Sequence, residues 1–325
     1  MIIQKNIFFS IYFFLYLSLI FGFCINEDFA GGFIKDYDLH FDLINKIFNK
    51  SIIYGLLNYD IYYVPHSPLF ILYLIVIKKI FVFEFLLRLF HLHLSLLIPF
   101  FIYLSIKIKY KIINYDLKLL LPAIFFLSPY FRAGAIWADD NIFALIFLSI
   151  SIFFFIKEKF NNDKHLRFIL LNVLFLAIAA YFRPIYSIIS IYFFLCFFNK
   201  IRLYKNLFLY VIFNLLLSFP AFYYIFILEI NKWATSYLFR FNFISTLSLV
   251  ISVILFYMMP IILFNYKNLI KEFLNLKLLV VSIVYFFLLY FFFQYDVSYS
   301  GGIFFKISKI IFYNNIFFYF IASLL

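Results

Sequence analysis

Residues 135–156 read AIWADDNIFALIFLSISIFFFI, and from Ile142 onward the only polar side chains in this run are two serines. A helix of this length extends about 33 Å, which is enough to cross the roughly 30 Å hydrocarbon core of a bilayer. The whole chain has the same character: of its 325 residues 67% are hydrophobic and 13% are charged, and the mean hydropathy is +1.05. Soluble domains are about half apolar and a quarter charged. The composition therefore excludes a soluble cytoplasmic enzyme.

The apolar residues predict an all-α, polytopic transmembrane protein with about 10–11 spans, because each span uses about 20 residues. Ten runs could span the bilayer: 7–25, 85–106, 117–131, 135–156, 166–181, 184–198, 206–228, 243–264, 277–293 and 309–325. The run 67–83 is shorter and contains Lys78 and Lys79. We expect it to be a re-entrant or interfacial helix.

The positive charges predict the orientation of these runs. If 67–83 does not cross, four clusters of basic residues fall on the same side as the N-terminus, as the positive-inside rule requires. The clusters are Lys107–Lys118, Lys157–Arg167, Lys200–Lys205 and Lys267–Lys277. The formal net charge of +12 thus reflects cytoplasmic loops and anionic lipid, and it does not indicate a nucleic-acid partner. Most of the acidic residues then face the extracytoplasmic side.

The chain shows no internal repeat and no linker composition. We expect one transmembrane domain over residues 1–325, with a long first extracytoplasmic loop at 26–66. Because the sequence ends inside an apolar run, we expect no soluble C-terminal domain.

The first loop contains AGGFIKDYDLHFDLINKIFNK, residues 30–50. From Leu39 the apolar residues recur at helical spacing, which predicts an amphipathic helix that lies in the membrane interface. Asp36 and Asp38 stand at its start, where either can cap the helix or act as a general base beside the membrane. His40 follows one turn after Asp36 and could orient that carboxylate or contact a phosphate or a metal.

Two further motifs follow the loop. His66-Ser67-Pro68-Leu69 precedes the short run, and Glu84 and Arg88 stand four residues apart, a spacing compatible with an ion pair on one helix.

In this order, the DYDLH motif, the HSPL motif and the Glu84…Arg88 pair resemble the GT-C superfamily of membrane glycosyltransferases. The chain is similar to the protein O-mannosyltransferase and aminoarabinose-transferase group over roughly residues 7–200. Leu127-Ser128-Pro129 followed by Trp137-Ala138-Asp139-Asp140-Asn141 resembles a later stretch of that group. The group often has Asp-Glu where this chain has Asp36-Tyr37, so both Asp36 and Asp38 remain candidates for the catalytic position.

The resemblance implies an inverting transfer of a sugar from a polyprenyl-phosphate donor to an acceptor glycan, lipid or protein, on the extracytoplasmic face of a bacterial inner membrane. The acceptor hydroxyl needs a carboxylate base, for which we expect Asp36 or Asp38. The leaving phosphate needs cations or hydrogen-bond donors; the candidates are His66, Arg88, Arg132 and Arg183. Arg132 and Arg183 also stand at span ends, where snorkelling to the interface explains them equally well. Asp139 and Asp140 could bind sugar hydroxyls or cap a helix.

Two other classes compete with this interpretation. A transporter or flippase of lipid-linked saccharides or small solutes usually shows paired halves and broken spans with midplane charges, which the sequence lacks. An O-antigen ligase or polymerase would need a large late outer loop. No metal-ligand cluster or cofactor motif is evident, and the sequence leaves the need for a divalent metal open.

Overall fold

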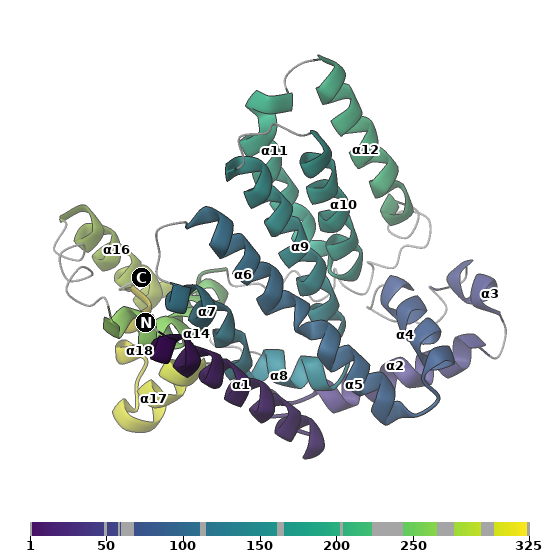
Figure 1. Cartoon of the computed structure of the whole chain (residues 1–325). Helices are drawn as coiled ribbons and strands as arrows, with labels where there is room; N and C mark the ends of the chain where they lie inside the picture. Colours follow the sequence, from purple (N-terminus) through teal and green to yellow (C-terminus); the bar gives the residue numbers. More distant parts are fainter. Residues whose placement is uncertain are drawn as a thin grey trace. The chain divides into compact units, whose positions relative to one another are not determined.

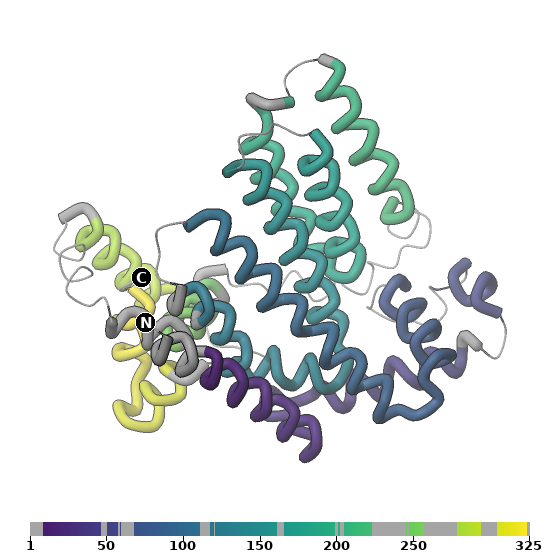
Figure 2. The backbone as a smooth tube through the Cα atoms, in the orientation of Figure 1, coloured from purple at the N-terminus to yellow at the C-terminus, as the bar shows by residue number. Residues whose placement is uncertain are grey.

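The computed structural model describes residues 2–48, 51–57, 59, 68–110, 115–160, 166–201, 204–222, 243–264, 276–293 and 302–323, which include all the residues coloured in Figure 2. Within these ranges every regular element is a helix and there is no β-strand. The all-α class is therefore confirmed for the described chain. Contacts divide the chain into two compact units, Met1–Ala234 and Thr235–Leu325, and the expectation of one domain over residues 1–325 stays a prediction.

The first unit contains the helices that Figure 1 labels α1 to α12, together with two short 3₁₀ helices, η2 and η3. They are α1 (Ile2–Cys24), α2 (Phe33–Phe48), α3 (Ile52–Leu57), α4 (Pro68–Ile80), α5 (Glu84–Ser95), α6 (Leu97–Lys109), α7 (Tyr115–Ala123), η2 (Ile124–Leu127), α8 (Pro129–Ile136), α9 (Asp140–Phe160), α10 (Leu166–Phe182), η3 (Pro184–Ile188), α11 (Ile189–Ile201) and α12 (Tyr204–Phe222).

The second unit contains α14 (Phe243–Phe264), α16 (Leu276–Phe292), α17 (Gly302–Phe312) and α18 (Ile316–Ser323). Its core is a small apolar cluster centred on Leu289, Phe305 and Phe318. The expected run 309–325 is not one helix, because α17 ends at Phe312 and Tyr313 adopts a left-handed backbone conformation (φ 53°).

Three helical segments are long and apolar enough to cross a membrane: Glu84–Lys109, Asp140–Phe160 and Lys205–Phe222. Five shorter apolar helices accompany them, at Phe9–Cys24, Leu166–Phe182, Pro184–Phe198, Leu247–Phe256 and Leu278–Phe292. The chain is thus a helical integral membrane protein. The count of 10–11 spans is not established by these helices and stays a prediction.

Two of the expected spans are interrupted, one by a proline and a helix cap and the other by a residue in the left-handed conformation. The run 117–131 forms no single helix, because α7 contains Pro122 and a new helix starts at Pro129. Ser128 caps that helix, since its Oγ accepts a hydrogen bond from Phe131 N at 3.3 Å. The run 135–156 is also divided, because Ala138 has a left-handed φ of 50° and α9 begins only at Asp140. The turn at 137–139 thus separates α8 from α9.

The expected interfacial segment 67–83 contains α4, which begins at Pro68 and has 13 residues. Proline is favoured in the first turn of a helix because its missing N–H has no partner there. A helix of 13 residues extends about 20 Å, less than the roughly 30 Å of the hydrocarbon core. Its length fits an interfacial or re-entrant position, and whether the segment crosses stays a prediction.

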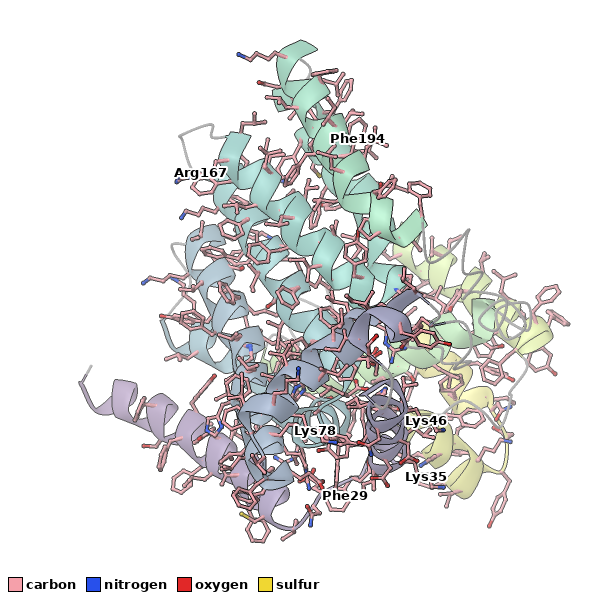
Figure 3. All side chains as sticks on the ribbon, turned by 90° about the vertical axis from the view of Figure 1, so that its right-hand side faces the viewer. Phe29, Lys35, Lys46, Lys78, Arg167 and Phe194 are labelled. Carbon is pink, nitrogen blue, oxygen red and sulfur yellow. The ribbon has the colours of Figure 1, made fainter. Side chains whose placement is uncertain are left out.

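Helices α9 and α10 pack side by side and run antiparallel (Figure 1). In the spanning window of α9 56% of residues are buried, against 6% for α12, so α9 is central and α12 peripheral. In Figure 3, Arg167 at the start of α10 lies at the opposite end of this unit from Phe29 and Lys35 of the first loop. The end of the unit at which the first loop lies is therefore also the end at which α9 begins, at Asp140, and α10 ends, next to Arg183.

One polar pair joins α9 to α10 in the apolar interior. Asn172 Nδ2 donates to the carbonyl oxygen and the Oγ of Ser151 at 2.9 and 2.8 Å, and Ser151 Oγ donates to the carbonyl oxygen of Asn172 at 3.0 Å. Both residues are completely buried.

We expect Asn172→Leu to lower the free energy of unfolding by about 1 kcal/mol, the size of an interhelical hydrogen bond in a membrane. The measurement is thermal unfolding in detergent. Asn214→Leu is the matched control, because Asn214 Nδ2 donates within its own helix, to Tyr210 O at 2.8 Å. Equal losses for the two variants would contradict an interhelical role for Asn172.

Candidate functional site

The first loop returns to the helical bundle immediately after α1. Asn26 adopts a left-handed conformation (φ 54°), which reverses the chain, and Glu27 N then donates to Gly22 O at 2.9 Å. The turn directs the Glu27 side chain inward, where only 3% of it is exposed. A carboxylate so deeply buried needs a charged partner.

Arg132 of α8 is that partner. Its Nε and Nη2 donate to Glu27 Oε1 and Oε2 at 2.7 and 2.5 Å in a bidentate pair. Its remaining donors reach Ser18 O and Oγ and Phe126 O at 2.9–3.3 Å. All five N–H groups of this guanidinium therefore have a partner within the protein. Arg132 joins α1 and the first loop to α8.

The ion pair depends on a close approach at Gly22. A Cβ added there would lie 2.1 Å from Glu27 Oε2 and 2.7 Å from Arg132 Nη2. Glycine is therefore the residue that leaves room for both side chains against α1.

Arg88 of α5 is also buried, with 8% of its surface exposed. Its Cζ lies 3.6 Å from the ring centroid of Trp137, its Nε donates to Ile136 O at 3.1 Å, and its Nη2 donates to Asn26 Oδ1 at 2.9 Å. The expected ion pair with Glu84 is not formed: these two described residues make no salt bridge, and Glu84 is exposed. Stacking on Trp137 holds the guanidinium instead.

Trp137 is the point where three segments meet. Its Nε1 donates to Glu27 O at 3.0 Å, its ring carries Arg88, and Tyr37 of α2 packs edge-on against it with ring centroids 5.8 Å apart. Residues around 27, 37, 88 and 137 are thus brought together from four separate parts of the sequence.

Helix α2 confirms the expected amphipathic helix, which begins at Phe33, before the predicted start. Its buried face agrees with the predicted apolar face at Leu43 and Ile44 but not at Leu39, which is 61% exposed, and it also includes Tyr37 and His40. The His40 ring packs edge-on against Phe70 of α4 with centroids 5.1 Å apart. The polar residues of the motif divide accordingly: Asp36 and Asp38 are exposed on either side of buried Tyr37.

A second polar cluster lies where α9 begins and α10 ends. Arg183 Nη2 donates to Asp140 Oδ1 at 2.6 Å, and Asp140 is completely buried whereas a third of the Arg183 side chain is exposed. Asp139 Oδ2 accepts a hydrogen bond from Asn141 N at 2.9 Å. Burial raises the pKa of the Asp139 carboxyl, the Asp140 charge adds to the rise and Arg183 opposes it, and the net result is a pKa of about 7.

Aromatic rings pack one turn beyond this cluster. Phe143 contacts Tyr73 (3.9 Å between centroids), His91 (5.0 Å) and Phe182 (5.3 Å). Both ring nitrogens of His91 lack a hydrogen-bond partner among the described residues. The cluster of Asp139, Asp140 and Arg183 therefore lies beside an apolar, aromatic layer.

The structure thus brings Arg88 close to Tyr37 of the DYDLH motif, and Asp139 and Asp140 close to Arg183. His66 lies outside the described residues. The site residues predicted from the sequence did not include Glu27, Tyr37 or Trp137. Glu27 had one signal, since it is the first acidic residue after the first apolar run and needs a basic partner.

Among the described residues no group of three or more His, Cys, Asp or Glu side chains could hold a metal ion. Comparisons with protein families, with curated proteins and with solved structures found no match to this chain.

We expect Glu27→Leu to destabilise the protein by about 3–5 kcal/mol, because it leaves the buried Arg132 charge without a partner. The double variant Glu27→Leu/Arg132→Met should recover most of this loss, since it removes both charges. Thermal unfolding in detergent measures both. A double variant as unstable as the single one would contradict the assignment of an isolated buried pair.

The raised pKa of Asp139 predicts a pH-dependent stability. The folded protein holds this proton more tightly than the unfolded chain, whose carboxyl pKa is about 3.9. The stabilising contribution of this proton should therefore be fully present below about pH 4, be lost as the pH rises through 7, and stay lost at higher pH. Asp139→Asn should flatten this part of the unfolding profile, and Asp42→Asn, which removes an exposed carboxyl of α2, should not. A fall that persists in Asp139→Asn would assign it to other groups.

Proposed function

We propose that the chain is an integral-membrane glycosyltransferase that moves a sugar from a polyprenyl-phosphate donor to an acceptor glycan, lipid or protein, with inversion at the anomeric carbon. The observation that carries the proposal is the junction at Trp137, where the DYDLH helix, the Arg88 helix and the start of the Asp139–Asp140 segment meet. These are three of the four stretches of sequence that resemble GT-C enzymes; the fourth is the HSPL motif.

The arrangement of charges supports the direction of the reaction. The ends of α9 and α10 that carry Asp140 and Arg183 are those on the side of the first loop, whereas Arg167 lies at the opposite end (Figure 3). We propose that the loop end faces outward, that the N-terminus is cytoplasmic and that 10–11 spans cross a bacterial inner membrane, so that basic residues remain inside.

In the proposed reaction the acceptor oxygen attacks the anomeric carbon, and the bond between that carbon and the phosphate oxygen breaks. The bonding electron pair leaves with the lipid phosphate, and the acceptor proton passes to a carboxylate. Asp36 or Asp38 is the proposed base, because both are exposed beside the membrane-spanning helices. Asp139 and Asp140, held beside Arg183, are proposed to bind sugar hydroxyls.

We expect Asp36→Asn or Asp38→Asn to reduce sugar transfer by about 10²–10⁴, the contribution of a positioned general base. The measurement uses membranes that contain the protein and a panel of labelled polyprenyl-phosphate hexoses and pentoses. Asp42→Asn is the matched control, since Asp42 is an exposed carboxyl on the same helix.

Two results would overturn this assignment. Transfer that survives both Asp36→Asn and Asp38→Asn would exclude the first-loop carboxylates as bases. Movement of the intact lipid-linked sugar across the membrane, without transfer, would favour a flippase.

A further inference from the structure

The three arginines that the sequence offers as phosphate ligands have different partners in the structure. Arg132 has all five donors bound, two of them to the Glu27 carboxylate. Arg183 is paired with Asp140 at 2.6 Å. Arg88 forms no salt bridge among the described residues, because its guanidinium binds only the neutral oxygens of Ile136 and Asn26. Arg88 therefore has no ion-pair partner among the described residues.

Arg88 also retains free donors. Its Nη1 makes no hydrogen bond to the part of the chain that the structure describes, and this nitrogen is not among the enclosed atoms. It is therefore not fully enclosed by the described residues. The stack on Trp137 and the contact with Phe23, at 3.6 and 5.3 Å from Cζ, hold the guanidinium at the end of α1.

Tyr37, whose ring contacts the same Trp137 as Arg88, provides a second free donor. The residue is 2% exposed, and its hydroxyl has no hydrogen-bond partner within the described residues. Burial raises the pKa of Tyr37 well above its usual range; the charge of Glu84 adds to the rise and that of Arg88 opposes it. The hydroxyl therefore remains protonated and can donate. A buried hydroxyl without a partner is unfavourable, and a bound acceptor would satisfy it.

We propose that Arg88 and Tyr37 form a binding site for the phosphate group of a polyprenyl phosphate, with Trp137 and Asn26 as positioning residues for the guanidinium. The identity of the lipid rests on the proposed function, whereas the phosphate chemistry rests on these two side chains. A planar guanidinium matches two phosphate oxygens, and the Tyr37 O–H supplies a third hydrogen bond. The site lies where α1 ends, so an isoprenoid chain could extend along the apolar helices.

Glu84 makes the site sensitive to charge. Its carboxylate is exposed one turn before Arg88, and its charge acts on both Tyr37 and Arg88. A bound phosphate experiences repulsion from this carboxylate. Removing the charge of Glu84 should therefore tighten phosphate binding. If Glu84 instead held Arg88 in place as a salt-bridge partner, removing its charge would not tighten binding.

The test uses the full-length protein in neutral detergent. Trp137 and Trp233 are its two tryptophans, so Trp233→Phe leaves Trp137 as the fluorescent reporter beside Arg88. In this background a polyprenyl phosphate, the matching neutral polyprenol and inorganic phosphate are titrated separately. We expect saturable binding of the polyprenyl phosphate and at least tenfold weaker binding of the polyprenol. Inorganic phosphate should bind only weakly. If it binds more strongly than the polyprenyl phosphate, the site is not one for a lipid phosphate.

The variants test each donor. Tyr37→Phe should raise the Kd for the polyprenyl phosphate about tenfold, because it removes one hydrogen bond to a charged group. Since the hydroxyl has no partner among the described residues, its melting temperature should not fall. Tyr73→Phe is the matched control: Tyr73 also has a hydroxyl without a partner in the described chain, but it belongs to α4, and its loss should leave the Kd unchanged. Arg88→Lys should weaken binding more than Tyr37→Phe, and Glu84→Gln should lower the Kd a few-fold.

The outcomes separate this proposal from the proposed function, because binding is measured without turnover. If the protein binds phosphate in a way that depends on Tyr37 and Arg88 but shows no transfer activity, the binding site is supported and the proposed glycosyltransferase function is overturned. A Kd unchanged in Tyr37→Phe, or equally changed in Tyr73→Phe, would overturn the site even if sugar transfer is observed. Absence of binding in the wild-type protein would overturn it directly.

Discussion

The ion pair between Glu27 and Arg132 holds the first loop against the helices, and the rest of the polar site depends on that contact. In an interior this apolar an isolated charge costs several kcal/mol, so the position of each buried carboxylate is tied to that of its cation. Because Glu27 follows α1 directly and Arg132 lies in α8, the pair fixes the turn that also contains Asn26. The same turn then supplies Asn26 Oδ1 to Arg88 and the Glu27 carbonyl oxygen to Trp137.

The turn at Asn26 and Glu27 begins a series of contacts in which each side chain positions the next. The Glu27 carbonyl orients the indole of Trp137, the indole supports the guanidinium of Arg88, and Tyr37 packs against the edge of the same ring. A substitution of Glu27 is therefore expected to shift Arg88 and α2 through Trp137, although the Glu27 side chain contacts neither of them. This explains why the polar contacts of the site are more specific than the aromatic packing around it, where many rings of similar size would fill the same space.

Composition and periodicity were sufficient for the class of fold and for most helices, because long apolar runs in this chain have few alternatives to helix. They failed where one or two residues override the hydrophobic pattern: Pro122 and the Ser128 cap divide one run, and the left-handed Ala138 divides another. The buried face of α2 was predicted only in part, because Leu43 and Ile44 are buried but Leu39 is exposed. Leu39 suits an apolar face by type, but contacts with Trp137 and Phe70 bury Tyr37 and His40 instead. Such tertiary contacts leave no periodic signal in one sequence, and neither does the pairing of Glu27 with Arg132, 105 positions later.

The geometry of α2 links the two proposals. Successive residues of an α-helix differ by about 100° around its axis, so Asp36 and Asp38 project to either side of Tyr37, which points inward toward Trp137. In an inverting transfer the acceptor approaches the face of the sugar opposite the leaving phosphate. A base and a phosphate ligand on one helix can meet this requirement only if they project in different directions. If the Tyr37 hydroxyl binds the phosphate, either neighbouring carboxylate is directed away from it and toward the surface, where an acceptor hydroxyl can arrive.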